Sequence, residues 1–526
     1  QDSSFDHICA SLERLEVWEC DSLINFGLDL SFFENLTTLD VWKCKEMLEF
    51  ITSSKARSLV CLVTMRIREC EMMRECPRMK NFYQGELTTP KLRKVQLTEI
   101  DSRGRWVDDL NATVEQLYKE QAGYRGLKHL KFSVFPELID IWSRNPQEML
   151  DFTALEFLEF CDTNKLRCIF NLSTVFSLRQ LRQMEIKRCG NLEQVIKEEG
   201  SSIMVEEATI HSSKIISIFP RLQSVKVESC PNMTSFYLGS KGLECLSLVE
   251  IKVADCSNMT TFVSTFSRDE DRGAIIGDEV DNAATFFSDK VGFPNLEKII
   301  ISHLRNAKRI WNGQVHTNSF SKLKELNVKE CDVLLNIFSH FLLGVFQRLE
   351  KLKVTDCASL EEVFQPQVQG LDIEETYAVH SQLREVNLVR LPKLKHVWTK
   401  HRKGNISFGN LRRVWIEECW SLKTLFPFSI AEDLHQLERL TIKRCGLEEI
   451  VSKRVEDSDE RENCFAFNQL SFLRLWYLPK LTCFYPGMHR TTWPALKQLK
   501  INRCGRIKIF GHEESDIPHP LFVIEK

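Results

Sequence analysis

A nine-residue pattern, Leu-x-x-Leu-x-Val-x-x-Cys, recurs with conservative replacements along this chain of 526 residues. The first copy has Leu12, Leu15, Val17 and Cys20 at its four fixed positions. The alternation predicts a short strand whose first, fourth, sixth and ninth side chains face inward, while the third, fifth and seventh face outward. One such strand cannot bury its own apolar side, so successive copies must stack on one another.

Seventeen copies of the pattern can be counted, in two forms. In eleven copies the ninth residue is Cys, which accounts for eleven of the nineteen cysteines. In the other form the ninth residue is usually another apolar one and is often followed by Pro, as at Leu391 and Pro392. The opening positions are Leu12, Leu36, Leu62, Leu92, Leu127, Leu155, Leu181, Leu222, Leu248, Leu296, Leu323, Leu349, Leu383, Leu411, Leu437, Leu470 and Leu496.

The residues that follow each strand complete the predicted fold. Apolar residues fall three and six places after the ninth position, as at Leu23 and Phe26. The pattern predicts an α/β solenoid, a leucine-rich-repeat horseshoe with parallel strands on the concave face and irregular or short helical segments on the convex face. Helical turns are predicted from Ser339 and from Ser429, and a capped amphipathic helix over 109–120.

A single repeat domain is predicted over 1–526, with about seventeen turns that open at Leu12 and end near Phe510. Because Gln1 begins the chain without Met or a leader peptide, we expect a fragment of a larger protein. Charged and Ser-rich stretches predict solvated loops between the turns. The expected irregular segments are 71–126, 197–217, 264–292, 365–380 and 452–463.

Composition and motifs argue against several other functions. The 70 Lys and Arg nearly balance the 73 Asp and Glu, so no nucleic-acid partner is predicted. No apolar run approaches the roughly 20 residues of a membrane helix. There is no phosphate-binding loop, no GxGxxG after a strand, no GxSxG, no HExxH and no CxxC. The sequence therefore predicts no catalytic residues, no cofactor and no metal site.

The repeated cysteines allow two interpretations. Stacked strands lie about 4.8 Å apart, so neighbouring thiols could pair or bind metal. The favoured interpretation is structural, because the ninth position turns inward and free Cys is among the most buried residue types. We expect these cysteines to be reduced, as in a cytosolic protein.

The outward positions of the last four copies predict a protein-binding surface. Their third, fifth, seventh and eighth residues include seven basic and two acidic side chains, together with exposed aromatic ones. Trp, Tyr and Arg commonly dominate the binding energy of interfaces. The alternative is that these aromatics only pack on their neighbours across a solvated sheet. The predicted binding residues are Arg413, Trp415, Arg439, Arg444, Arg474, Trp476, Tyr477, Lys500 and Arg503, with Trp18 and Trp42 as a smaller candidate.

Two segments carry a resemblance to a known family. Residues 383–451 contain LREVNLVRLPKLKHVW, FGNLRRVWIEECWSLKTLF and LHQLERLTIKRCGLEEIV, and residues 88–142 contain TTPKLRKVQL and LKHLKFSVFPELIDIW. They resemble the repeats of plant coiled-coil nucleotide-binding leucine-rich-repeat disease-resistance proteins. The resemblance implies a cytoplasmic immune receptor whose repeats hold the switch off and help to sense a pathogen effector or a modified host protein. It also implies a nucleotide-binding module, outside this chain, as a partner.

Two other binding functions stay open on the sequence. Substrate-binding repeats of F-box ubiquitin-ligase subunits also use a Cys turn of about this length, although the segment after Cys differs here. An extracellular receptor would explain the six Asn-x-Ser/Thr sequons, which include Asn35 and Asn232. The Gly-x-Ile-Pro element usual in such receptors is missing.

Overall fold

The structure, a computed structural model, divides into two compact units, Gln1–Leu248 with Ser264–Ser267 and Val249–Val263 with Arg268–Lys526. Both contain the nine-residue repeat, and each is described by itself. The residues that the structure describes are 13–18, 35–42, 61, 63–68, 87–88, 94–98, 121–122, 128–133, 154–198, 215–265, 285–311, 319–338, 346–364, 379–398, 406–453, 463–487, 489–504, 506, 510–512 and 522–524.

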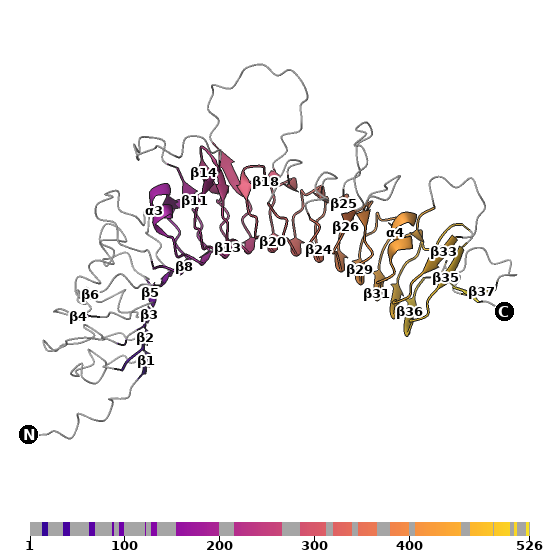
Figure 1. The fold of residues 1–526 in the computed structure, drawn as a ribbon, viewed down its shortest axis with the longest axis horizontal. Coiled ribbons are helices and arrows are strands. Elements are labelled where there is room, and N and C mark those ends of the chain that lie inside the picture. The colour runs from indigo at the N-terminus through magenta and orange to yellow at the C-terminus, as the bar shows by residue number, and fades with distance from the viewer. Residues whose placement is uncertain are drawn as a thin grey trace, which may run out of the picture. The chain divides into compact units, whose positions relative to one another are not determined.

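The first unit stacks short parallel strands in register (Figure 1). Leu130 lies opposite Leu158, which lies opposite Met184, and all three side chains are buried. Because apolar positions coincide in register, each strand covers the inward side chains of its neighbours. The main strands are β1 (Arg14–Trp18), β2 (Thr38–Trp42), β3 (Thr64–Arg68), β5 (Lys94–Thr98), β7 (His129–Ser133), β8 (Phe157–Cys161), β10 (Gln183–Lys187) and β13 (Ser224–Glu228).

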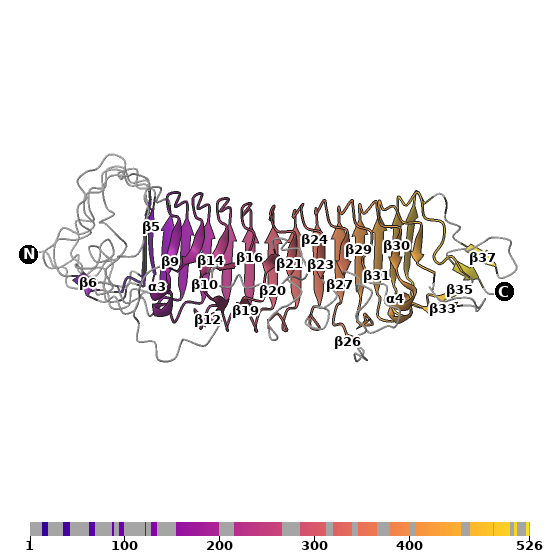
Figure 2. The ribbon, with the colours of Figure 1, turned by 90° about the horizontal axis from the view of Figure 1, so that it is seen from above.

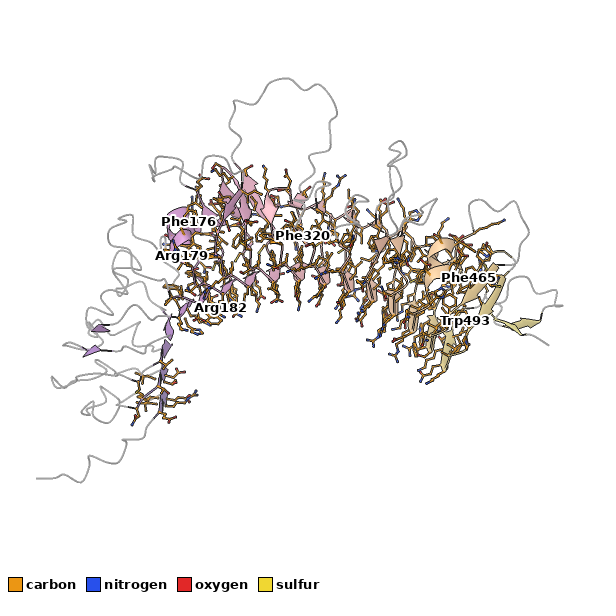
Figure 3. The ribbon with its side chains drawn as sticks, in the orientation of Figure 1. Phe176, Arg179, Arg182, Phe320, Phe465 and Trp493 are labelled. Atoms are coloured by element: carbon orange, nitrogen blue, oxygen red, sulfur yellow. The ribbon has the colours of Figure 1, made fainter. Side chains whose placement is uncertain are left out.

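Outer elements close the other side of this core. They are β4 (Leu87–Thr88), β6 (Gln121–Ala122), β9 (Cys168–Asn171), α3 (Leu172–Ser177), β11 (Gln194–Lys197), β12 (Ile215–Ser217), β14 (Ser235–Gly239) and β15 (Gly242–Glu244). The Asn171 side chain caps α3, accepting a hydrogen bond from the Thr174 amide at 2.9 Å. Figure 3 shows Phe176 of this helix on the outer side and Arg182 on the main-strand side.

The second unit repeats the same arrangement. Its main strands are β16 (Glu250–Ala254), β20 (Lys298–Ser302), β22 (Glu325–Lys329), β24 (Lys351–Thr355), β27 (Glu385–Val389), β29 (Arg413–Glu417), β31 (Arg439–Lys443), β34 (Phe472–Trp476) and β36 (Gln498–Asn502). Leu326, Leu352 and Val386 lie opposite one another and are buried. Figure 2 shows these strands side by side.

The outer elements of the second unit are mostly short strands. They are β18 (Thr285–Phe287), β19 (Val291–Gly292), β21 (Arg309–Trp311), β23 (Asn336–Phe338), β25 (Glu362–Phe364), β26 (Val379–His380), β28 (Ile406–Ser407), β30 (Thr424–Phe426), α4 (Phe428–Asp433), β32 (Glu449–Val451), β33 (Asn463–Ala466), β35 (His489–Thr492), β37 (Phe510–His512) and β38 (Phe522–Ile524). A further strand, β17 (Val263–Thr265), spans residues of both units.

A column of buried aromatic rings runs along the core of the second unit. Trp311, Phe338, Phe364, Trp398 and Phe426 stack in turn, with ring centroids 5.2–6.4 Å apart. Each residue lies seven places after the ninth position of its repeat. The apolar positions expected from the repeat, three and six places after the ninth residue, do not include this column. Offset stacking of this kind adds to the stabilisation from burial.

From the repeat that opens at Leu155 onward, the eighth residue of each repeat adopts a left-handed backbone conformation. Asp162 and Tyr477 have φ values of 57° and 52°. Their amides extend the parallel pairing beyond the strand, to the carbonyl oxygens of Lys187 at 3.0 Å and Asn502 at 2.7 Å. These hydrogen bonds offset the steric cost of a positive φ in a non-glycine residue.

The predicted solenoid of one parallel strand per turn is confirmed. Each main strand begins two residues after an opening leucine, and seventeen such strands occur in the described residues. The helical turn predicted from Ser429 is α4, whereas 109–120 and 339–345 lie outside the described residues. Several predicted loops were too long, because 215–217, 285–287 and 379–380 form outer strands. The single repeat domain over 1–526 stays a prediction.

Candidate protein-binding surface

The side of the main strands that carries the third, fifth and seventh repeat positions is called here the ladder face. In β29 the exposed Arg413 and Trp415 alternate with the buried Val414 and Ile416. Parallel register then places the predicted residues of β29, β31, β34 and β36 on the same face of the second unit. The eighth-position residues Arg444, Tyr477 and Arg503 follow directly at the strand ends.

Two neighbours hold the Trp415 side chain in place. Its indole Nε1 donates a hydrogen bond to Glu417 Oε2 at 2.9 Å. Lys443 Nζ lies 4.1 Å from the ring centroid, a cation–π contact, and also pairs with Glu417 at 3.6 Å. The indole is 37% exposed. Trp415 therefore presents an ordered aromatic surface whose local charges are already neutralised.

Two of the predicted arginines form ion pairs within the sheet. Arg413 Nη1 donates to Glu385 Oε1 at 2.9 Å, and Arg444 Nη1 donates to Glu418 Oε1 at 2.8 Å. The hydrogen bond to Glu418 raises the pKa of the Arg444 guanidinium further above its usual value. These two charges therefore add little to a positive field. Fewer of the basic residues predicted in the last four repeats carry an unpaired charge than the sequence indicated.

Three other cations surround the ring of Phe472, and this arrangement is called here the Phe472 cluster. Arg439 Cζ, Arg474 Cζ and Lys500 Nζ lie 5.1, 5.6 and 5.6 Å from the ring centroid. Among the described residues, none of these cations forms an ion pair with a carboxylate. Arg474 Nε is buried and has no hydrogen-bond partner there. Three cations without a described carboxylate partner therefore meet at one ring.

One residue that the alternation predicts to be exposed is buried in the structure. Thr441, in β31, occupies the fifth position of its repeat but is only 4% exposed. It lies opposite Trp415 in one neighbouring strand and Arg474 in the other. The short side chain is covered by its longer neighbours, so the expectation that fifth positions are open was wrong at this residue.

Exposed aromatic side chains lie at or beyond the ends of β29 and β34, two residues or more along from Arg474, and are called here the aromatic rim. Trp420, Trp476 and Tyr477 are 44%, 41% and 40% exposed. The rings of Trp420 and Tyr477 meet edge to face at 6.1 Å, although one complete repeat separates their strands. A Cβ at Gly446, in the intervening repeat, would lie 1.9 Å from the Trp420 carbonyl oxygen. Only glycine allows such a close approach.

Sequence reasoning identified most of these residues but not their grouping. Trp420 was missed because it is the tenth residue of its repeat and lies beyond the alternation of the strand. Phe472 was among the outward positions but had no distinguishing signal. Its neighbours become visible only from the register, which sets Arg439 opposite Phe472 and Arg474 opposite Lys500.

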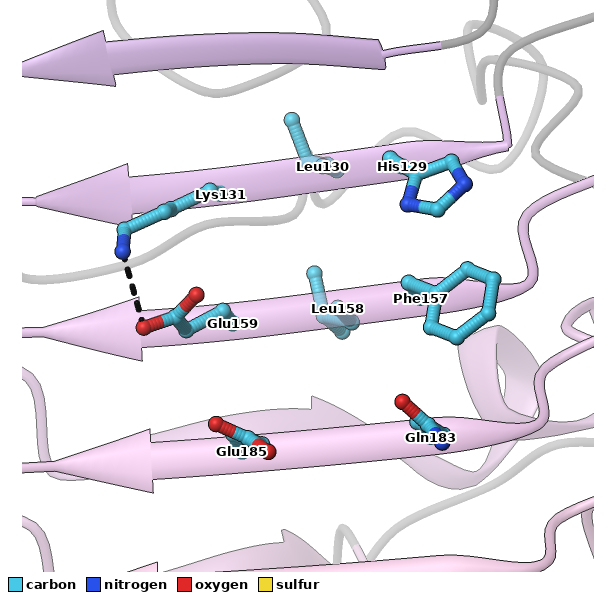
Figure 4. A pocket seen from close by; sticks show the side chains of 8 residues that line it. All are labelled: His129, Leu130, Lys131, Phe157, Leu158, Glu159, Gln183 and Glu185. Carbon is cyan, nitrogen blue, oxygen red and sulfur yellow. Dashed lines mark hydrogen bonds and ion pairs between the residues drawn. The ribbon is translucent and has the colours of Figure 1, made fainter.

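A hollow of about 250 Å³ lies on the ladder face of the first unit (Figure 4). The His129 ring stacks on Phe157 with centroids 4.2 Å apart. Lys131 Nζ lies 2.9 Å from Glu159 Oε1, as the dashed line in Figure 4 shows. These residues were not among the predicted sites.

Charges on neighbouring strands β7, β8, β10 and β13 of this ladder face are paired. Glu185 accepts hydrogen bonds from Lys187 at 2.7 Å and Lys226 at 3.1 Å. Burial alone would raise the pKa of Glu185, but the two ammonium groups outweigh it and hold the pKa below its ordinary value. In the first two repeats, Trp18 lies opposite Trp42 in the register, and their side chains lie outside the described part.

The described cysteines at the ninth position lie just beyond the ends of their strands. Cys189 Sγ donates a hydrogen bond to the Lys187 carbonyl oxygen at 3.5 Å, and Cys445 Sγ donates to that of Lys443 at 3.1 Å. Both thiols are buried, as predicted, whereas Cys504 in the last repeat is only partly buried. This recurrent contact explains why a small, weakly polar side chain suits the position.

The described residues contain neither a metal-binding cluster nor a helix that could span a membrane. Among them, no three His, Cys, Asp or Glu side chains group closely enough to hold a metal ion. No helix in that part of the chain is long and apolar enough to cross a membrane.

Parts of the chain are similar to known plant proteins. Residues 106–190 and 295–446 match the model described as "Plant disease resistance protein RPS2-like, leucine-rich repeats". These two stretches are similar to the leucine-rich repeats of plant disease resistance proteins. A stretch of 142 residues is 30% identical to "Probable disease resistance protein At4g27220" of Arabidopsis thaliana, which covers 26% of this chain and 14% of that protein. The chain thus spans only a small part of that relative.

Solved structures of other leucine-rich-repeat proteins are more distant. The leucine-rich repeat domain of the type III effector XCV3220 (XopL) is 16% identical with a TM-score of 0.32, over 53% of this chain and 72% of that one. The Leptospira interrogans protein LIC12759 is 12% identical with a TM-score of 0.21, over 68% and 86%. At these scores the solenoid fold of the chain rests on its own strand register.

Proposed function

We propose that this chain is the protein-binding repeat domain of a cytoplasmic plant immune receptor. It takes part in recognising a pathogen effector or a modified host protein, and in holding the receptor inactive until then. The RPS2-like repeats and the similarity to a probable disease resistance protein support this function. The chain acts by binding and not by catalysis.

One observation carries the proposed recognition surface. The aromatic rim exposes Trp476 and Tyr477 next to the cations of the Phe472 cluster on the ladder face of the second unit. Ordered aromatic and arginine side chains lose little conformational freedom on binding and commonly dominate interface energetics. A nearby positive field would also speed association with an acidic protein surface.

The test is a quadruple alanine variant of Arg413, Trp415, Arg474 and Trp476 in the full-length receptor. We expect loss of the immune response to the recognised effector while the receptor accumulates normally. The response would be measured as cell death in leaf tissue, and protein level by immunoblot. An unchanged response in the folded variant would refute the surface.

A matched control lies on the same ladder face outside the patch. Replacing Lys298, Glu325, Lys351 and Lys353 with alanine also removes four outward side chains of main strands. This control should leave recognition intact. Equal losses in the two variants would indicate a general effect of altering the sheet and would count against the assigned position.

The autoinhibitory role is assigned to the first repeats. Trp18 and Trp42 lie opposite one another in adjacent strands, and we propose that they dock the nucleotide-binding module. Replacing both with alanine should produce a receptor that signals without effector, because the inactive state loses a contact. A variant that stays silent without effector and responds normally with it would overturn this docking site.

The cytoplasmic location has a chemical test. The protein contains nineteen cysteines, and the cysteines that the structure describes are free thiols. Thiol counting on denatured protein, purified without exposure to oxidants, should give close to nineteen groups. Several disulfides, or glycans at Asn35 and Asn232, would instead favour an extracellular receptor.

A further inference from the structure

We propose that the Phe472 cluster is a binding site for a carboxylate side chain, so that the partner docks through an acidic peptide segment. This inference deepens the proposed function and rests on it. It identifies the chemistry of the partner at one place on the ladder face, centred on Phe472 in β34.

The register makes the cluster electrostatically costly without an anion. Arg474 in β34 and Lys500 in β36 lie directly opposite one another, each at the fifth position of its repeat. Like charges in directly opposed positions of a sheet repel one another. Arg439 lies opposite Phe472, so a third cation approaches from the other side. The faces of the aromatic ring partly offset this repulsion, as cation–π contacts do.

Unused hydrogen-bonding capacity points in the same direction. Arg474 Nε is buried and has no partner in the described part of the chain. A buried donor without an acceptor is unfavourable, and a carboxylate oxygen is a strong acceptor for guanidinium. Gln498, the first residue of β36 and the third of its repeat, adds an exposed amide opposite Phe472. An incoming carboxylate could therefore satisfy charge and hydrogen bonding together.

The surroundings favour an acidic peptide over a nucleic acid. The next cations along the strand ends, Lys443 and Arg444, already pair with Glu417 and Glu418. Arg503, after β36, is a further described cation without an ion pair, but the three cations at Phe472 gather around a single ring and form no track. Single-stranded nucleic acids need a groove that follows several successive phosphates, which these carboxylates would interrupt. The aromatic rim next to the cluster suits apolar side chains that flank an acidic residue.

The experiment measures binding of labelled peptides to the purified chain by fluorescence anisotropy. The probe is a Trp-containing peptide with four glutamates, and its matched control carries glutamine at the same positions. We expect the glutamate peptide to bind and the glutamine peptide to bind at least tenfold more weakly. The triple variant Arg439→Gln, Arg474→Gln, Lys500→Gln should lose roughly tenfold or more in affinity for the glutamate peptide.

Two further variants separate a local site from a general charge effect. The double variant Arg413→Gln, Arg444→Gln removes cations that are already paired, and should change the affinity less than twofold. Phe472→Leu keeps every cation but removes the ring, and should weaken binding several-fold. Hydrogen exchange of the β34 and β36 amides, unchanged in each variant, would show that the sheet stays folded.

Several outcomes would overturn the proposal. Equal affinity for the glutamate and glutamine peptides, or no loss in the triple variant, would remove the carboxylate site. A phosphoserine peptide or an oligouridine that binds more than tenfold tighter, through the same three cations, would assign the site to phosphate instead. If the triple variant loses peptide binding but the full-length receptor still responds to its effector, the site stands and the proposed recognition surface fails.

Discussion

The ladder faces of the two units handle charge in different ways. In the first unit, Glu185 lies between Lys187 and Lys226 and pairs with both. In the second unit, Arg474 and Lys500 lie opposite one another with no described carboxylate between them. The same backbone repeat thus carries a neutralised network in one unit and a concentrated positive cluster in the other.

Stacking in register explains why this difference matters. Equivalent positions of adjacent repeats lie about 4.8 Å apart. The neighbours on both sides therefore determine whether an outward charge is neutralised or repelled. Alternating signs, as at Lys131 and Glu159, stabilise the sheet without outside help. In a run of like charges the repulsion raises the free energy of the sheet, and an opposite charge on another molecule would relieve it. The comparison therefore separates a structural part of the face from a part available for binding.

The largest effect is expected from a pair of glycines at the tenth position. Gly446 in the second unit and Gly190 in the first both follow the ninth-position cysteine. A Cβ at Gly446 would lie 1.9 Å from the Trp420 backbone oxygen, whereas one at Gly190 would lie 3.3 Å from the Asn164 side chain. Gly446→Ala should therefore destabilise its repeat by about 2–3 kcal/mol, as overpacking against backbone does. Gly190→Ala should stay within about 0.5 kcal/mol.

Native-state hydrogen exchange of the neighbouring strand amides measures these opening free energies unit by unit. The Gly446→Ala variant should also separate Trp420 from Tyr477 and change the near-ultraviolet circular dichroism of the aromatic rim. Equal costs at the two glycines would contradict the close approach assigned to Gly446. A stable variant with an unchanged aromatic signal would do the same.

The strand positions were predictable because they depend on local alternation. Each opening leucine placed its strand correctly, and burial of Cys189 and Cys445 followed from the same phase. The aromatic column needed information on packing between repeats, since Phe338 and Phe364 lie beyond the nine-residue pattern. Outer strands such as β12 fell in stretches whose composition indicated loops, because pairing and not composition forms them.

The candidate surface was predictable only in part, for a related reason. Alternation indicates which side chains face outward, and it correctly exposed Trp415 and Trp476. It cannot show that Arg413 is neutralised by Glu385 or that Thr441 is covered, because both depend on cross-strand neighbours. The sequence predicted a basic surface over four repeats, and the register shows that three of its cations meet around Phe472.

Charge reversal should have opposite signs in the two units. Glu185→Lys would set three ammonium groups side by side and should destabilise β10 by about 1–2 kcal/mol. Lys500→Glu would place a carboxylate opposite Arg474 and should leave β36 unchanged or stabilise it by about 0.5 kcal/mol. Hydrogen exchange of the β10 and β36 amides gives both values.

The controls for this pair keep the charge but change the side chain. Glu185→Asp and Lys500→Arg should each shift the opening free energy by less than the corresponding reversal. If both reversals destabilise their strands by similar amounts, the contrast between a paired and an unpaired ladder face is wrong.

The smallest effect concerns pH. The pKa of Glu185 is lowered in the folded chain, because hydrogen bonds from Lys187 and Lys226 outweigh the opposing effect of burial. A carboxylate of this kind stabilises the fold above its unfolded pKa, about 4.3, and loses that contribution as the pH falls through its folded pKa. Glu185→Gln should therefore cost about 1 kcal/mol near pH 7, and progressively less below about pH 4. Lys500→Gln should show no such dependence between pH 7 and pH 3, since no described carboxylate pairs with Lys500. Hydrogen exchange across a urea series, corrected for the intrinsic effect of pH on exchange, gives the opening free energy of β10 and β36 at each pH. A cost at Glu185 that persists unchanged at pH 3 would mean that packing and not charge holds this side chain, and the two ladder faces would then differ less than their ion pairs indicate.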